Sequence, residues 1–252
     1  MKEPLFISFC TQKGGVGKST MTILAADWLY YRAGLNIAVV DCDFPQHSID
    51  ELRNREKEIL ASNDTYKLMM MRQFNTVNKK AYPILRCRPD TAISEVKNLI
   101  EYADTEYDVI LFDLPGTINT AGVIYIMSSL DYMFVPMRAD RLIMQSTLYF
   151  AKTINERFIQ NPAANTKGVY LFWNMVDRRE KPDLYTSFEK LLDKLNLSHF
   201  KTRIPMRSKF NKELPDSGTN VYRSTIFVPD ASFLTECGFT SLMQEVRDII
   251  KL

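Results

Sequence analysis

The sequence lacks several features that mark whole classes of protein. Its 252 residues include four cysteines, Cys10, Cys42, Cys87 and Cys237, and no two of them form a C-x-x-C pair. This spacing argues against a zinc ribbon or a dithiol site and predicts reduced thiols. No internal repeat, such as a duplicated ATPase would show, and no low-complexity linker is present. We therefore expect one domain over residues 1–252.

Signals for export or membrane insertion are also missing. Glu3 and Pro4 precede a short apolar run, so the N-terminus does not resemble a signal peptide. The most apolar stretch, residues 121–137, is interrupted by Ser128, Ser129 and Asp131, which makes it too polar for a membrane span. The composition, with 46% hydrophobic and 25% charged residues, is that of an ordinary globular protein. We expect a cytoplasmic protein without membrane contact.

Short apolar runs alternate with helical patterns along the chain. The runs predict strands at 5–10, 37–40, 82–87, 109–112, 132–136 and 169–173, with a weaker one at 200–204. Helices are predicted at 19–33, 48–60, 92–103, 120–128, 145–159, 182–195 and 240–251. Residues 63–80 read as a helix plus a loop, whose Met69, Met70 and Met71 are expected to fill core space. This alternation predicts an α/β fold: a three-layer, doubly wound, mostly parallel sheet flanked by helices.

A glycine-rich loop follows the first predicted strand directly. It reads Lys13-Gly14-Gly15-Val16-Gly17-Lys18-Ser19-Thr20 and opens the first predicted helix. Glycines let backbone N–H groups converge on an anion, the helix N-terminus adds its positive dipole end, and Lys18 and Ser19 supply a charge and a magnesium ligand. A flexible turn is the simpler interpretation, but the flanking strand and amphipathic helix supply the context that a phosphate loop requires. The expected ligands are a nucleoside triphosphate and Mg²⁺.

The loop departs from the ordinary P-loop pattern at two positions. That pattern places a glycine at position 12, where the chain has Gln12, and a second lysine, Lys13, follows. One phosphate chain does not need both lysines. We therefore expect Lys13 to serve a phosphate held elsewhere, for instance across a dimer interface.

Carboxylates follow two of the predicted strands. Asp41 and Asp43 come after the run at 37–40, and Asp113 ends the run at 109–112 and precedes Pro115 and Gly116. A single aspartate at a strand end is often only a turn former. Together with the loop, these acids indicate a nucleotide site in which Asp113 holds magnesium-bound water and the Pro-Gly pair moves with the γ-phosphate.

With these motifs the chain resembles the ParA/MinD group of deviant Walker A ATPases, and most of all ParA-type partition proteins. Residues 13–20, 39–46 and 110–116 resemble the three nucleotide motifs of that group. Residues 203–207 and 213–221 resemble the ParA stretch that closes over the base and leads to the final helix. A related branch is carried on conjugative elements and acts in transfer, and the sequence does not separate that role from plasmid or chromosome partition.

The resemblance implies roles for individual residues. Lys18 would bind the β- and γ-phosphates, Ser19 would bind Mg²⁺ with help from Asp41 and Asp113, and Asp43 would position the water for hydrolysis. Lys13 would reach the partner's nucleotide in an ATP-bound sandwich dimer. The rest of the loop, Gly14, Gly15, Val16, Gly17 and Thr20, and the later Pro205 would also contact ATP. Asn174 is a candidate for adenine recognition, although an asparagine at a strand end is as often a turn residue.

Two positions differ from the family pattern. The group usually reads D-x-D-P-Q, whereas this chain places Phe44 before Pro45, and Gly116 stands where a second proline is more usual. The extra residue leaves the direction of Gln46 open. Slow or partner-dependent hydrolysis would fit either change.

A basic segment suggests a partner. Between residues 194 and 212 the chain has six basic residues and no acid: Lys194, Lys201, Arg203, Arg207, Lys209 and Lys212. A solvated surface is the plain alternative. The resemblance favours nonspecific duplex DNA as partner, with Arg223 joining the contacts, nucleoid association of the ATP-bound form, and a ParB-like or conjugation-related activator.

Two other functions compete with this one. A MinD-like membrane ATPase needs a basic amphipathic tail, whereas Leu242, Val246 and Ile249 make the last predicted helix a core-facing one. A dethiobiotin-synthetase-like enzyme shares the loop but generally lacks the extra lysine, so Lys13 argues against it.

Overall fold

The computed structural model describes residues 3–117, 119–161, 164–215 and 220–252. The strands are β1 (Leu5–Phe9), β2 (Ile37–Asp41), β3 (Ile84–Arg86), β4 (Val109–Asp113), β5 (Tyr132–Met137) and β6 (Gly168–Trp173). The first helices are α1 (Lys18–Asp27), which continues as the π-helical η1 (Trp28–Arg32), then α2 (Ser48–Ser62), α3 (Asp64–Val77), α4 (Ala92–Tyr102) and α5 (Ala121–Ser129). They are followed by α6 (Arg141–Ile154) with η2 (Asn155–Ile159), α7 (Pro182–Lys194), η3 (Ser208–Asn211), α8 (Ala231–Glu236) and α9 (Phe239–Ile250).

All six strands form one parallel sheet in the order β3-β2-β4-β1-β5-β6. Its inner strands are continuous apolar runs because both faces of the sheet are covered, and every residue of β2 and β4 is buried. The predicted doubly wound α/β fold is confirmed, with a sheet that is parallel throughout. Parallel strands end at one edge, so the segments after β1, β2 and β4 meet there.

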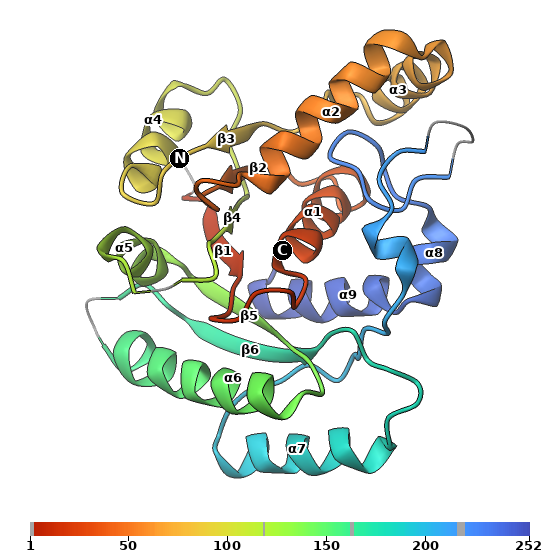
Figure 1. Ribbon diagram of the computed structural model, residues 1–252. Helices are drawn as coiled ribbons and strands as arrows, with labels where there is room; N and C mark the ends of the chain where they lie inside the picture. The colour runs from red at the N-terminus through yellow and green to blue at the C-terminus, as the bar shows by residue number, and fades with distance from the viewer. Residues whose placement is uncertain (1–2, 118, 162–163, 216–219) are drawn as a thin grey trace.

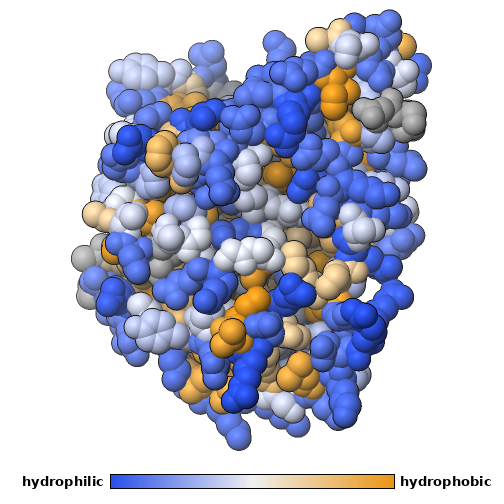
Figure 2. All heavy atoms as spheres, viewed as in Figure 1, coloured by the Kyte–Doolittle hydropathy of each residue, from blue (hydrophilic) through white to orange (hydrophobic). Residues whose placement is uncertain are grey.

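Helices cover both faces of the sheet (Figure 1). The core on one face joins β1 and β2 to α1, α2, α8 and α9. The core on the other face joins the sheet to α4, α5, α6 and α7. On the side seen in Figure 2 hydrophilic residues predominate, and apolar ones gather only in small groups.

A smaller core ties α2 and α3 to the chain that leads into α8. Leu60, Tyr66 and Phe227 are buried there, with Met69 and Met70 packed against them. The predicted helix within 63–80 is confirmed as α3. The expected packing holds for two of its three methionines, since Met71 is exposed.

The prediction of a strand at 200–204 is wrong. Isolated bridges at His199 and Pro205 flank this segment, and the N–H groups of Phe200 and Ile204 at its ends donate to β6 carbonyls, both at 2.8 Å. Between them, the N–H groups of Lys201 and Thr202 donate to the carboxylate of Glu245 in α9, both at 2.9 Å. These two N–H groups, bound to Glu245, are therefore not available for hydrogen bonds to a neighbouring strand.

Two helices, α6 and α8, also differ from the predictions. Helix α6 begins earlier than predicted because the Asp140 side chain accepts hydrogen bonds from the N–H groups of Leu142 and Ile143, as an N-cap does. Short α8 was not predicted; Asp230 caps it. Across the described ranges, no helix is both long and apolar enough to cross a membrane.

Candidate functional site: a nucleotide loop and its acids

The glycine-rich loop lies between β1 and α1, and two of its glycines have conformations that other residues rarely adopt. Gly15 has φ 72° and Gly17 has φ 90°. At Gly17 a Cβ would also lie 2.6 Å from the side-chain nitrogen of Asn174. That amide donates a hydrogen bond of 2.8 Å to the carbonyl of Val16, so the end of β6 holds the loop in place.

The side chains of the two loop lysines, Lys13 and Lys18, lie in different positions. The ammonium group of Lys18 folds back over the loop and donates to the carbonyl of Lys13 at 3.5 Å. A Cβ at Gly116 would lie 3.7 Å from that ammonium and 3.9 Å from the nitrogen of Gly14, so the segment after β4 lies against the loop. Lys13 itself is exposed. The Lys18 side chain thus lies over its own loop, whereas Lys13 is exposed to solvent.

Asp41 is buried at the end of β2 and is held by backbone donors. Its Oδ2 accepts from the N–H groups of Ile49 and Asp50, both at 2.9 Å, and its Oδ1 accepts from that of Asp43 at 3.2 Å. Burial raises the pKa of Asp41, and these N–H donors oppose the rise. Asp41 thus caps α2 through Oδ2. Its Oδ1 accepts a single backbone hydrogen bond and could take a further contact.

Asp113 lies beside Asp41 in the sheet register but has a different environment. It is fully buried, and within the described part of the chain neither carboxylate oxygen accepts a hydrogen bond. Burial raises the pKa of Asp113 to about 7, and the nearby Ser19 hydroxyl only partly offsets this. Burying a carboxylate that accepts no hydrogen bond costs free energy of folding, unless a ligand contacts its oxygens.

The donors fit Mg²⁺, which in nucleotide sites takes one or two protein oxygens and completes its shell with water and phosphate. Ser19 and Asp113 would hold the ion, which when bound neutralises charge on the phosphates. Among the residues that the structure describes, no three His, Cys, Asp or Glu side chains form a metal-binding group. Phosphate and water oxygens would have to supply most of the ligands.

The turn after β2 accommodates the extra Phe44. The N–H of His47 donates to the carbonyl of Asp43 at 2.8 Å, which closes the turn. Phe44 is 49% exposed, with its ring centroid 5.1 Å from the Arg88 guanidinium carbon and 5.8 Å from that of the His47 ring. The Phe44 side chain is therefore directed outward, and Gln46 is exposed beside it. Asp43 is half-buried; burial raises its pKa, and Lys18 lowers it.

Sequence reasoning missed Ser48, the first residue of α2. Its hydroxyl donates to that of Ser19 at 3.4 Å, so a second hydroxyl group lies at the expected magnesium site. A serine at the start of a predicted helix was the available signal, and it reads more simply as a cap.

Pro205 forms an isolated β-bridge with Val176, shortly after β6. Base recognition by Asn174 and Pro205 stays a prediction.

Within the basic segment, the six side chains divide into two groups. Arg203 makes a bidentate pair with Glu189, at 2.9 and 2.7 Å, and lies over the Tyr185 ring, while Lys209 lies over the Tyr222 ring. The others have no such contact among the described residues, and three of them are exposed: Lys194, Lys201 and Lys212. Arg207 is half-buried. Arg223 turns toward the nucleotide loop, where it contacts Thr20 and Glu213.

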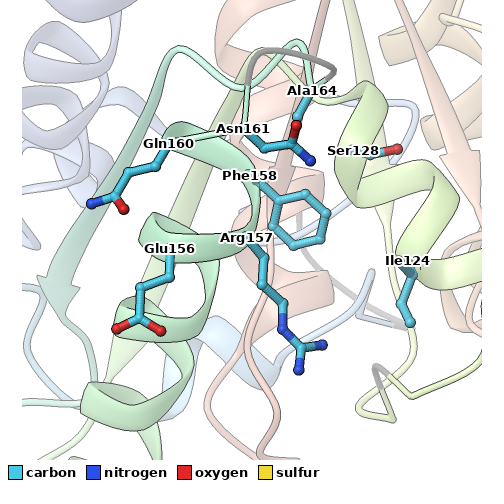
Figure 3. A pocket seen from close by; sticks show the side chains of 8 residues that line it. All are labelled: Ile124, Ser128, Glu156, Arg157, Phe158, Gln160, Asn161 and Ala164. Carbon is cyan, nitrogen blue, oxygen red and sulfur yellow. The ribbon is translucent and has the colours of Figure 1, made fainter.

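A cavity of about 780 Å³ lies elsewhere, between α5 and the end of α6 (Figure 3). Ile124 and Ser128 line it from α5, and Arg157 and Phe158 line it from η2. These segments lead into the starts of β5 and β6, so the cavity is at the sheet edge opposite the loop. It takes no part in the nucleotide site.

A parallel sheet with this loop and Asp113 at its carboxyl edge defines a P-loop nucleotide-binding protein of the deviant Walker A type. Residues 5–143 match the model of the family described as ATPase MipZ. The chain belongs to this family of ParA/MinD-type ATPases. No curated protein matches it.

Solved structures show the same fold at low identity. A putative plasmid partition protein from Borrelia burgdorferi, bound to AMPPNP, is 18% identical, with a TM-score of 0.62 over 97% of this chain and 100% of that one. A ParA family ATPase from Chlorobium tepidum is 13% identical, with a TM-score of 0.57 over 99% and 98%. The pNOB8 ParA bound to nonspecific DNA is 16% identical, with a TM-score of 0.54 over 98% and 97%.

Proposed function

We propose that this protein is an ATP-driven switch that dimerises on binding Mg-ATP, binds duplex DNA without sequence preference, and is reset by hydrolysis. The observation that carries the proposal is the contrast between the two lysines of the loop. Lys18 is folded over its own loop, while Lys13 is exposed beside it. An outward cation at the rim of a phosphate site is suited to the nucleotide of a second subunit.

The residues of the site divide the chemistry between them. The N–H groups of the loop and Lys18 bind and orient the phosphates. Ser19 and Asp113 hold the magnesium ion, and Asp41 keeps α2 and the turn after β2 in place through its backbone hydrogen bonds. Asp43, next in that turn, orients the attacking water. Since Gly116 lies close to Lys18, the segment after β4 can respond to the γ-phosphate.

The exposed lysines of the basic segment are the proposed DNA contacts. Lys194, Lys201 and Lys212 are exposed and so accessible to phosphates, whereas Arg203 and Lys209 are engaged within the chain. Phosphate contacts of this kind release counterions, which makes binding salt-dependent and insensitive to sequence. The pNOB8 ParA bound to nonspecific DNA supports this proposal at the level of a shared fold.

The cellular role follows as part of the same proposal. A switch of this kind would serve plasmid or chromosome partition, or the maintenance or transfer of a conjugative element. Its ATP-bound dimer would associate with the nucleoid until a ParB-like or conjugation-related activator triggers hydrolysis.

DNA binding tests the proposal directly. We expect duplex DNA to bind in Mg-ATP or a slowly hydrolysed analogue, but not in ADP, and to weaken steeply with salt. The double variant K201Q/K212Q should reduce the slope of log affinity against log salt by about 2, roughly one for each lost phosphate contact. The measurement is fluorescence anisotropy of labelled duplexes over a salt series.

Arg203→Gln is the matched control, because it removes one positive charge from the same segment at a side chain that is already paired. It should leave the slope nearly unchanged. Equal DNA binding in ADP and ATP, or no binding at low salt, would contradict the proposal.

A further inference from the structure

Arg223 departs from the surface role that its charge suggests. Its side chain is only 18% exposed. One terminal nitrogen lies 3.4 Å from the hydroxyl of Thr20, and the other donates to Glu213 at 3.1 Å. The guanidinium therefore lies at the start of α1, next to the phosphate loop, rather than among the exposed lysines.

Arg223 has unused binding capacity at this place. Its Nε is buried and, as far as the described residues extend, has no hydrogen-bond partner. Its contact with Thr20 is long for an N–H donor to oxygen. The guanidinium therefore keeps N–H donors for an anion, at Nε and at the terminal nitrogen that contacts Thr20.

The charge around Arg223 is also incomplete. Glu213 is its only carboxylate partner within the described chain, and Arg55 binds the same carboxylate with two hydrogen bonds, of 2.9 and 3.1 Å. Two guanidinium groups therefore share one negative charge. Arg55 lowers the pKa of Glu213 more than Arg223 does. Glu213 therefore balances the charge of Arg223 only in part, while Glu51 and Glu56 also lie near Arg55.

Thr20 lies at the end of α1 where an anion would bind. It lies in the first turn of α1, where the first regular helical hydrogen bond runs from the N–H of Met21 to the carbonyl of Gly17. The N–H groups before Met21, that of Thr20 among them, precede this bond and are the helix donors that bind phosphate.

We propose that Arg223 is a nucleotide-binding residue, which binds the phosphate chain from the side of Thr20 as a second cation of the same subunit, opposite Lys18. This inference rests on the proposed nucleotide site at the loop and adds to it a residue from the far end of the chain. Arg223 would also tie the bound nucleotide to the segment before α8, because Ser224 and Thr225 next to it are buried against α2.

The test is the affinity for fluorescent ATP and ADP analogues in excess Mg²⁺, for the wild type and Arg223→Gln. A charged hydrogen bond contributes enough that we expect roughly 10- to 100-fold weaker binding of both nucleotides. Competition by inorganic tripolyphosphate should weaken similarly, which places the contact on the phosphates. Arg157→Gln makes the same substitution at an exposed position by the remote cavity and should change neither affinity by more than about twofold.

Thermal unfolding without nucleotide checks that the variant is folded. Arg223→Lys keeps the charge but loses most of the N–H donors of the guanidinium, so it should bind about 3- to 10-fold more weakly, and it serves as the test if Arg223→Gln does not fold. Unchanged nucleotide affinity in a folded variant would overturn the inference, and a loss confined to DNA binding would return Arg223 to the DNA surface. Absence of ATP binding in the wild type would instead reject the proposed function itself.

Discussion

Two buried carboxylates of this protein differ in what surrounds them. Glu56 in α2 accepts from both the N–H and the hydroxyl of Thr225, and Arg53 binds the carbonyl and hydroxyl of the same residue. Asp113 in β4 is as deeply buried, yet in the described chain neither of its oxygens has a hydrogen-bond partner, and the nearby Ser19 hydroxyl offsets the effect of burial on its pKa only in part. The first group holds two segments of the chain together. The second is the carboxylate that we propose as a magnesium ligand.

The network around Glu56 extends further into the fold. Arg53 also donates to the carbonyl of Tyr82 at 3.1 Å, and the Tyr82 hydroxyl donates to Asp27 of α1 at 3.1 Å. Burial raises the pKa of Asp27 well above its usual value. These buried hydrogen bonds connect α1, α2 and the segment before α8, although within the described chain the second oxygen of Asp27 has no partner.

Breaking this network should give the largest change in stability. Glu56→Ala leaves the N–H and hydroxyl of Thr225 and the charge of Arg53 without their partner in the interior, so we expect the free energy of unfolding to fall by about 3–5 kcal/mol. Urea denaturation measures it. Glu58→Ala, on the exposed side of the same helix, should change it by less than about 0.5 kcal/mol. Equal effects of the two variants would remove the structural role of Glu56.

Replacing Asp113, whose carboxylate has no hydrogen-bond partner in the described chain, should raise the free energy of unfolding. With a folded-state pKa of about 7 and an ordinary unfolded value of 3.8, Asp113 retains its proton on folding, so its contribution to stability falls as pH rises from about 4 to 7 and stays low above. The full shift corresponds to about 4 kcal/mol. An unpaired amide costs part of that, so Asp113→Asn should stabilise the nucleotide-free protein at pH 8 by about 1–2 kcal/mol.

The same variant should lose the extra nucleotide affinity that Mg²⁺ provides. Urea denaturation at pH 5 and pH 8, together with ATP titrations with Mg²⁺ and with a chelator, measures both effects. Destabilisation at pH 8, or full retention of the magnesium effect, would contradict the assignment of Asp113 as a metal ligand.

Sequence patterns predicted the six strands of the sheet and the glycine-rich loop because both depend on local chemistry. Buried parallel strands read as apolar runs, and the conformations of Gly15 and Gly17 require glycine, so six strands and the loop are visible in the residues themselves. The segment at 200–204 was mistaken for a strand because its two central N–H groups, of Lys201 and Thr202, go to Glu245, a residue more than forty positions away.

Contacts between distant segments also explain what was missed at the site. Charge alone grouped Arg223 with the basic segment, while its burial next to Thr20 depends on how the end of the chain folds back on α1. Likewise, Arg203 counts as a surface cation until its pairing with Glu189 is known. The proximity of Ser48 to Ser19 depends on the turn that follows β2.

The ATP-dependent mass of the protein tests the central claim most directly, namely that the site is a switch in which Lys13 serves a second subunit. Light scattering with size exclusion should show a dimer for the hydrolysis-deficient Asp43→Ala variant in Mg-ATP and a monomer in ADP. Adding Lys13→Gln to that variant should leave ATP affinity within a fewfold but yield a monomer in both nucleotides. A dimer that persists without Lys13, or a mass that is the same in ATP and ADP, would contradict the account.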